Sequence, residues 1–173
     1  VHMIAKMNSL LDKGIIEKLY EASQAGVKIE LIVRGICVLI PGIPGVSDNI
    51  TVRSIVGRFL EHSRIFWFRN GGREELYISS ADWMPRNLND RVELMVPIED
   101  PEIKRRLKQM VDIELSDNQK AHIMQADGTW LKTISAENQL CAQEYFQKIA
   151  EKRDAEDEMT LAQKLEPYTP VLG

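Results

Sequence analysis

The stretch of sequence that decides the fold is residues 4–37, IAKMNSLLDKGIIEKLYEASQAGVKIELIVRGIC. Residues 4–8 have the alternation of a short strand. Ser9 or Asp12 can then cap a helix, in which apolar residues recur at helical spacing from Leu11 until Gly26 ends it. Residues 27–33, VKIELIV, are rich in β-branched side chains and predict a second strand. A strand, a helix and a strand in this order form the βαβ unit of a parallel sheet, so we predict an α/β fold.

The rest of the chain predicts further strands and helices. Four apolar segments are predicted as strands, with an Asn-Gly-Gly hairpin signal between the second and the third: residues 50–56, 64–68, 75–80 and 92–97. A helix should run from Asp100 to about Leu115. Beyond Asp117 we expect a polar helical extension, with a long amphipathic helix over residues 135–152 and a loose tail over 165–173.

The composition is that of an ordinary globular domain. The 173 residues are enough for one domain with a real core, and 44% of them are hydrophobic. The net charge of −4 gives no reason to expect nucleic-acid binding. No apolar run reaches the roughly 18 residues that a membrane span needs, and no secretory signal is visible. Cys37 and Cys141 stand far apart without metal-type spacing, which favours a reducing, cytoplasmic compartment.

Residues that can bind phosphate gather around the predicted hairpin. His62 and Arg64 precede its first strand in FLEHSR, and Ser80 and Asp82 follow its second strand in YISSADW. Arginine suits phosphate because its planar fork can donate two parallel hydrogen bonds to phosphate oxygens. These four residues are therefore predicted to form a phosphate site. Ser80 and Asp82 are equally compatible with capping the turn that follows the strand.

Two more cations belong to the predicted site because of where their strands end. Arg34 follows the strand 27–33, and open parallel sheets bind ligands at the carboxyl ends of their strands. Lys6 lies on the first strand near the same edge and could steer polyanions. A salt bridge for Arg34 and a solvated ammonium for Lys6 are the alternatives. No set of metal-ligating residues is expected.

Long blocks of the sequence resemble a known family. They occur in order at residues 6–37 (quoted above), 44–68 (PGVSDNITVRSIVGRFLEHSRIFWF) and 77–87 (YISSADWMPRN). They resemble the C-terminal domain of bacterial polyphosphate kinase, the type that works through a phosphohistidine. The resemblance covers residues 4 to about 120. It implies a phospholipase-D-like α/β fold, with a mixed sheet flanked by helices and a helical C-terminal extension.

The resemblance also implies domain limits and a function. Residues 4–127 would be the phospholipase-D-like domain and 128–173 a helical extension with a loose tail, while residues 1–3, Val-His-Met, are themselves expected to be an expression-vector remnant. The whole enzyme would move the terminal phosphate of ATP reversibly onto inorganic polyphosphate, through a phosphohistidine in an upstream domain that this chain lacks. Arg34 and His62 match the nucleotide-contacting positions of the family, and His62 would be catalytic.

Cofactor, partners and location follow from the same resemblance. Mg²⁺ would accompany the nucleotide and be held mostly by the absent domain. The expected partners are ATP or ADP, polyphosphate, the remaining domains of the enzyme and further copies of it in a homo-oligomer, but no nucleic acid. The expected location is the cytoplasm, including the inner face of the membrane.

Two alternatives stay open from the residues. Phospholipase D enzymes carry His-x-Lys, a downstream Asp and Gly-Ser-x-Asn. Here Arg64 replaces the lysine and Arg69 stands where the Asp would fall, which argues against a self-sufficient phosphodiesterase or phospholipase of that superfamily. The other alternative is a non-catalytic scaffold domain.

Overall fold

The computed structural model describes residues 1–164, with side chains described as far as residue 154. Its centre is one eight-stranded mixed sheet in the order β6-β5-β4-β1-β2-β3-β7-β8. The strands are β1 (His2–Met7), β2 (Lys28–Val33), β3 (Ile50–Ile55), β4 (Ile65–Asn70), β5 (Arg73–Ser79), β6 (Met95–Pro97), β7 (Ala121–Met124) and β8 (Trp130–Lys132). The helices are α1 (Lys13–Gln24), α2 (Pro85–Asn89), α3 (Pro101–Leu115) and α4 (Ala142–Lys164).

The βαβ prediction is confirmed. β1 pairs in parallel with β2, and β2 with β3, so the carboxyl ends of these three strands lie side by side. The edge where the parallel strands end is this side of the sheet, formed by their carboxyl ends. β4 runs antiparallel to β1 on its other side, with Lys6 opposite Ile65. The side chain of Asp12 accepts a hydrogen bond from the backbone N–H of Ile15 at 2.9 Å, which fixes the start of α1.

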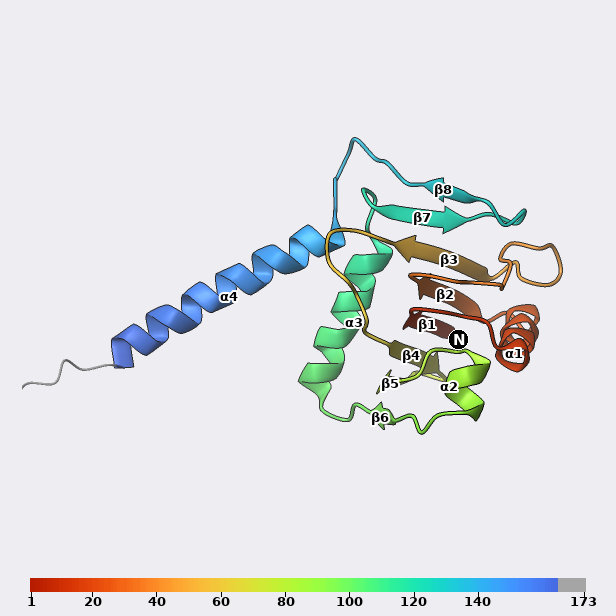
Figure 1. Cartoon of the computed structure of the whole chain (residues 1–173), viewed down its shortest axis with the longest axis horizontal. Helices are drawn as coiled ribbons and strands as arrows, with labels where there is room; N and C mark the ends of the chain where they lie inside the picture. Colours follow the sequence, from red (N-terminus) through yellow and green to blue (C-terminus); the bar gives the residue numbers. More distant parts are fainter. Residues whose placement is uncertain (165–173) are drawn as a thin grey trace, which may run out of the picture.

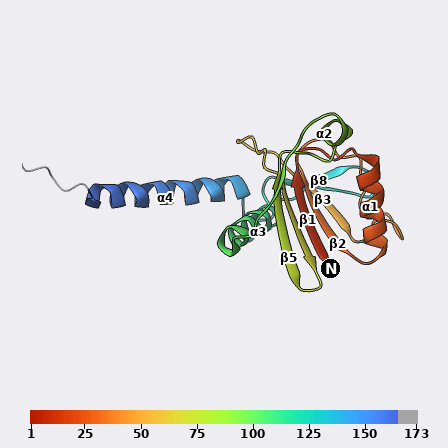
Figure 2. The same cartoon turned by 90° about the horizontal axis from the view of Figure 1, so that it is seen from below.

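Helices cover both faces of the sheet (Figures 1 and 2). α1 packs on one face, over a core that includes Leu19, Leu31 and Phe66. α3 packs on the other face, where Val111 meets Trp67. α4 begins beside the end of α3 and projects away from the sheet (Figure 1).

The hairpin and the third helix also form as predicted. Gly71 and Gly72 both have positive φ, 56° and 86°, as a two-residue turn that matches strand twist requires. Asp100 caps α3 by accepting from the N–H groups of Glu102 and Ile103, both at 2.9 Å, and Pro101 occupies the first turn.

The prediction of helix alone beyond Asp117 is wrong. β7 and β8 form there, and β7 pairs antiparallel with β3. One oxygen of the buried Asp117 carboxylate accepts hydrogen bonds from the N–H groups of Gln119, Lys120 and Ala121, which turns the chain out of α3 and back to the sheet. The free side of β3 then supplies hydrogen-bond partners for the backbone of β7, and local sequence preference does not reveal such partners.

Other predicted boundaries differ in detail. The strand predicted over 92–97 is limited to β6, and the helix predicted over 135–152 begins later, at Ala142. The predicted tail at 165–173 lies outside the described residues. The predicted limit at residue 127 falls between β7 and β8 of one sheet, and β1 begins at His2. The domain limits themselves, with residues 1–3 as a vector remnant, stay predictions.

Among the described helices, none combines the length and the apolar character that crossing a bilayer requires.

Candidate functional site

The loop over residues 56–64 carries His62 and joins β3 to β4 at the edge where the parallel strands end. Most of the loop is exposed, and the side chain of Leu60 is 79% exposed. His62 is exposed as well, and no described residue forms a hydrogen bond with its imidazole. The ring is therefore free to meet a ligand from solvent.

Arg34 follows β2 at the same edge, and its backbone is fixed on both sides. Its N–H donates to the carbonyl of Met7 at 3.2 Å, and its carbonyl accepts from the hydroxyl of Ser54 at 3.0 Å. Nη1 of the guanidinium is buried and has no hydrogen-bond partner among the described residues. Because a buried charged donor without a partner is costly, it marks a place where an anion would be favourable.

Arg34 and His62 line two neighbouring hollows. Arg34 lines one of about 430 Å³ together with residues 56–60. His62 lines the other, of about 470 Å³, between the loop and the side chains of Met110 and Phe146 on α3 and α4. Phe59 and Leu60 line both hollows. The structure therefore brings the two predicted residues to one edge, on either side of one exposed loop segment.

Arg64 and Asp82 are paired with each other. Nε and Nη2 of Arg64 donate to the two oxygens of Asp82 at 3.1 and 3.0 Å. The same carboxylate accepts from the backbone N–H of Asn8 at 2.7 Å, and Arg64 Nη1 donates to the carbonyl of His62 at 3.0 Å. Burial works to raise the pKa of Asp82, but the bonds from Arg64 and Asn8 outweigh it and lower the pKa. The pair ties the end of the His62 loop to β1.

Ser80 is engaged by the segment that leads to β6. Its hydroxyl accepts from the backbone N–H of Leu94 at 2.9 Å and donates to Glu93. Asn87 of α2 donates to the same Glu93 carboxylate at 2.5 Å. Ser80 thus organises the turn after β5, in agreement with the capping alternative.

Lys6 does not reach the surface. It is 5% exposed, and its ammonium donates to the carboxylates of Glu61 and Glu114. Burial and the neighbouring Glu61 raise the pKa of Glu114 to about 8, against the opposite effect of Lys6. Burial works to raise the pKa of Glu61 too, but Glu114 and Lys6 outweigh it and lower the pKa to about 2. At neutral pH the cluster therefore carries one positive charge, one negative charge and one protonated carboxyl.

Of the six predicted site residues, Arg34 and His62 have side-chain groups without partners in the part of the chain that the structure describes, and the other four form hydrogen bonds or ion pairs within the protein. The phosphate contacts of Lys6, Arg64, Ser80 and Asp82 stay predictions. Residues that the sequence analysis missed, Glu61, Glu114 and Gln143, lie around the loop. A signal for Glu114 exists, since it follows Leu107 and Val111 on the apolar stripe of α3, where a carboxylate needs a partner.

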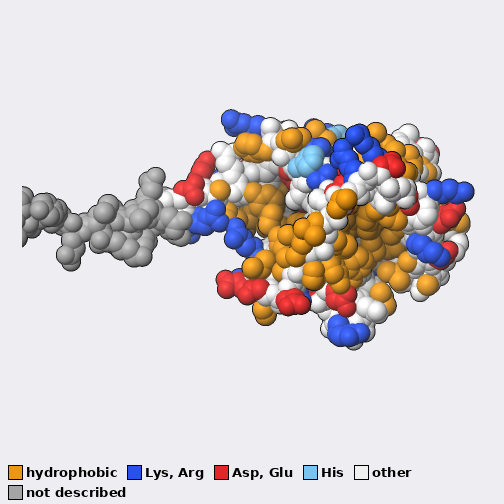
Figure 3. Space-filling model, turned by 60° about the horizontal axis from the view of Figure 1, so that its bottom comes forward, with side chains coloured by type: hydrophobic (Ala, Val, Ile, Leu, Met, Phe, Trp, Pro, Cys, Tyr) orange, Lys and Arg blue, Asp and Glu red, His pale blue; other side chains and the backbone are white. Residues whose placement is uncertain are grey.

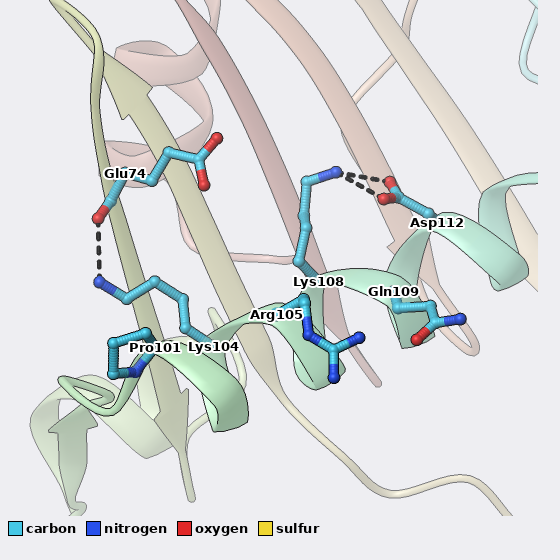
Figure 4. Close-up of a pocket in the computed structure, with 7 residues that line it drawn as sticks. All are labelled: Glu74, Pro101, Lys104, Arg105, Lys108, Gln109 and Asp112. Carbon is cyan, nitrogen blue, oxygen red and sulfur yellow. Dashed lines mark hydrogen bonds and ion pairs between the residues drawn. The ribbon is translucent and has the colours of Figure 1, made fainter.

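A third hollow lies at the other end of α3 (Figure 4). It has a volume of about 550 Å³ and is lined by Lys104, Arg105 and Lys108. Lys104 donates to the carbonyl of Glu74 at 3.2 Å, and Lys108 binds both oxygens of Asp112 at 2.7 Å. These cations lie near the hairpin turn that joins β4 to β5, at the opposite ends of the strands from the His62 loop.

No group of three or more His, Cys, Asp or Glu side chains suited to a metal ion occurs among the described residues. The buried carboxylates near His62 are occupied, since Glu61 and Glu114 bind Lys6 and Asp82 binds Arg64. The described residues therefore do not fit a resident Mg²⁺ at this edge.

Known proteins match the chain over most of its length. The family model described as polyphosphate kinase C-terminal domain 2 matches residues 1–143. A polyphosphate kinase of Pseudomonas aeruginosa is 56% identical over 138 residues, which are 80% of this chain and 20% of the relative. One of Staphylococcus haemolyticus is 62% identical over 126 residues, 73% of this chain and 18% of the relative.

The crystal structure of the polyphosphate kinase from Porphyromonas gingivalis is similar with a TM-score of 0.84 and 44% identity, over 89% of this chain and 24% of that chain. The phospholipase-D-like α/β fold and the family resemblance are thus confirmed. The chain spans about a fifth of the length of the curated relatives that it matches. With a family model matched over most of its residues and relatives more than half identical, the chain belongs to the polyphosphate kinase family, as the C-terminal domain 2 of that family.

Proposed function

We propose that the chain acts as the C-terminal part of a polyphosphate kinase, which transfers the terminal phosphate of ATP reversibly to inorganic polyphosphate. The phosphohistidine would lie in a part of the enzyme outside this chain. The observation that carries the proposal is the guanidinium of Arg34, whose Nη1 is buried, without a partner among the described residues, beside a hollow at the edge that bears His62. A phosphate oxygen is the partner that this fork of donors fits.

The chemistry of phosphoryl transfer suits such a sparse site. The protein supplies mainly position and charge neutralisation, and little covalent chemistry is needed. Arg34 would neutralise charge on the nucleotide or on the transferred phosphate. His62 would donate a hydrogen bond or move a proton at a phosphate oxygen, because its imidazole is exposed and has no hydrogen-bond partner among the described residues. Mg²⁺ would arrive with the nucleotide and shield phosphate charge.

The rest of the enzyme supplies the expected partner of an apolar surface. Large exposed apolar side chains stand on and near β5, β6 and α2, among them Ile78, Leu88, Leu94, Met95 and Val96. Figure 3 shows apolar side chains gathered over a broad area of one face. Patches of this kind mark protein contacts. We place other domains of the same enzyme here, and expect a homo-oligomer in the cytoplasm, where ATP is available, with contact to the inner face of the membrane as a further expectation.

Binding of ligand to the chain itself tests the proposal. The chain is titrated with ATP and with polyphosphate in a calorimeter, at low and at high salt. The affinity should fall strongly with salt, because it rests on arginine contacts to phosphate. Arg34→Gln should abolish the binding. Salt-independent binding, or binding that survives Arg34→Gln, would place the ligand elsewhere.

Activity separates the proposal from its alternatives. The purified chain should show no ATP-dependent polyphosphate synthesis alone and no hydrolysis of a phosphodiester. In the complete enzyme, His62→Ala should lower the transfer rate by about 10² to 10⁴, the usual contribution of general acid–base assistance. Diester hydrolysis by the chain would favour the phosphodiesterase, and full activity of His62→Ala in the complete enzyme would favour a scaffold.

A further inference from the structure

Gln143, in the first turn of α4, is clamped onto the backbone of the His62 loop. Its side-chain oxygen accepts from the N–H of Phe59 at 3.0 Å, and its amide nitrogen donates to the carbonyl of Phe59 at 2.8 Å. The same nitrogen donates to Glu61 at 2.9 Å. Gln143 is 6% exposed, so these bonds form away from solvent. The amide thus binds both backbone polar groups of one loop residue as a strand neighbour would.

A close approach at Gly57 shows that the loop and Gln143 fit each other. A Cβ added at Gly57 would lie 2.3 Å from Oε1 and 2.9 Å from the side-chain amide carbon of Gln143. Real Cβ atoms do not approach other atoms so closely. An alanine at this position would force the amide of Gln143 to shift, and the shift would disturb its bonds to Phe59.

The first turn of α4 and Glu61, on either side of the Gln143 amide, are both bonded to the rest of the protein. Asp117, at the end of α3, accepts from the N–H of Ala142 at 2.8 Å with its second carboxylate oxygen. Glu61, which Gln143 contacts, also binds the buried Lys6 of β1. Without these ties the loop has little support, because residues 56–60, 62 and 63 are all exposed. The position of His62 therefore depends on contacts made at Phe59 and Glu61, three residues and one residue before it, in addition to the bond from Arg64 to its carbonyl.

We propose that Gln143 is a positioning residue, which holds the loop over residues 56–64 in the shape that presents His62 to phosphate. The inference rests on the proposed function, because it assumes that His62 acts on the phosphate. It assigns α4 a role in the reaction through its first turn, without contact to substrate.

Gln143→Met tests the clamp, since methionine keeps the length of the side chain and loses all three hydrogen bonds. In the complete enzyme this variant should lower kcat by about 10²-fold, the scale on which small misplacements act, with a much smaller change in KM for ATP. Gln139→Met is the matched control, four residues upstream and exposed, and should leave kcat unchanged. In the 173-residue chain, the Phe59 amide should exchange faster in Gln143→Met, and the NMR titration curve of His62 should shift.

A double-mutant cycle adds a second, independent test. Gly57→Ala should lower kcat strongly when Gln143 is present, and should cost little more when Gln143→Ala has removed the amide that it would strike. Additive losses in the cycle would overturn the inference. So would full kcat in Gln143→Met, if His62→Ala abolishes activity in the same enzyme. If His62→Ala is itself fully active, the proposed role of His62 fails first, and the clamp loses its function with it.

Discussion

Three ionisable side chains that lie close together inside the protein make its stability depend on pH. Lys6 sits at the centre of the sheet between Glu61 of the loop and Glu114 of α3. One cation cannot balance two carboxylates in a buried site, so one of the two keeps its proton. Glu114 is the more deeply buried, at 2% exposed, and its pKa is raised to about 8.

This cluster predicts a stability that depends on pH. The folded protein keeps a proton on Glu114 between its ordinary pKa of 4.5 and about 8, where the unfolded chain has lost it. The free energy of unfolding should therefore fall as pH rises through this window, by up to about 1.4 kcal/mol per pH unit. Urea denaturation at a series of pH values measures it. Glu114→Gln, which mimics the protonated acid, should flatten the slope, and an unchanged slope would contradict the assignment.

Arg34 gives a second prediction at this scale. Arg34→Lys keeps the charge but loses the planar fork, so ATP should bind at least about 10-fold more weakly, the loss expected for one charge-assisted hydrogen bond. Calorimetry on the chain measures the affinity. Arg73→Lys, at the exposed hairpin turn, is the control and should bind ATP like the parent. Equal affinity of Arg34→Lys and the parent would show that charge alone matters.

Asp117 lies just after α3, and its side chain connects that helix with β7 and with the first residue of α4. Its two oxygens accept four backbone N–H groups, those of Gln119, Lys120, Ala121 and Ala142. The single side chain therefore sets both the turn into β7 and the place from which Gln143 reaches the loop.

Loss of that carboxylate should be costly to stability. Asp117→Ala leaves two buried N–H groups, those of Ala121 and Ala142, without their partner, and we expect the free energy of unfolding to fall by about 3 kcal/mol or more. Asp112→Ala serves as control, because its i,i+4 pair with Lys108 is exposed and worth about 0.3–0.5 kcal/mol. Urea denaturation of both variants provides the measurement. A loss for Asp117→Ala no larger than the control's would contradict this role.

Sequence patterns revealed the elements whose local signals agree with their tertiary setting. The capped helices after Asp12 and Asp100 are of this kind, as is the Asn-Gly-Gly hairpin. β7 and β8 were not predicted, because their pairing depends on the unpaired side of β3, which is distant in sequence. The sequence predicts Arg34 at the carboxyl ends of the parallel strands, where the structure also has the loop that carries His62, while their binding of phosphate stays a prediction. The buried ion pairs of Lys6 could not be predicted from the sequence, because its two partners lie 55 and 108 residues away.

In the molecule as a whole, the two outermost strands of the sheet, β6 and β8, differ in the exposed apolar side chains around them. The β6 edge adjoins exposed apolar side chains, including Leu94, which is 66% exposed. The β8 edge carries Leu131, 58% exposed. The proposed contact with other domains of the enzyme involves the surface near β6 only.

A matched pair of substitutions tests that assignment. Leu94→Lys should leave the stability of the isolated chain within about 0.5 kcal/mol of the parent, as surface changes usually do. In the complete enzyme it should lower the melting temperature, because a charge would enter an apolar contact. Leu131→Lys should change neither. Equal effects of the two substitutions on the complete enzyme would remove the reason to favour the β6 side.

The strand order has a consequence for synthesis on the ribosome. β1, near the start of the chain, lies in the middle of the sheet and needs β4, while β3 needs β7, whose residues 121–124 emerge much later. Until then β3 presents an open row of N–H and C=O groups, which can pair with a neighbouring chain. The nascent protein is therefore most prone to aggregate during the interval between the exit of β3 and the exit of β7.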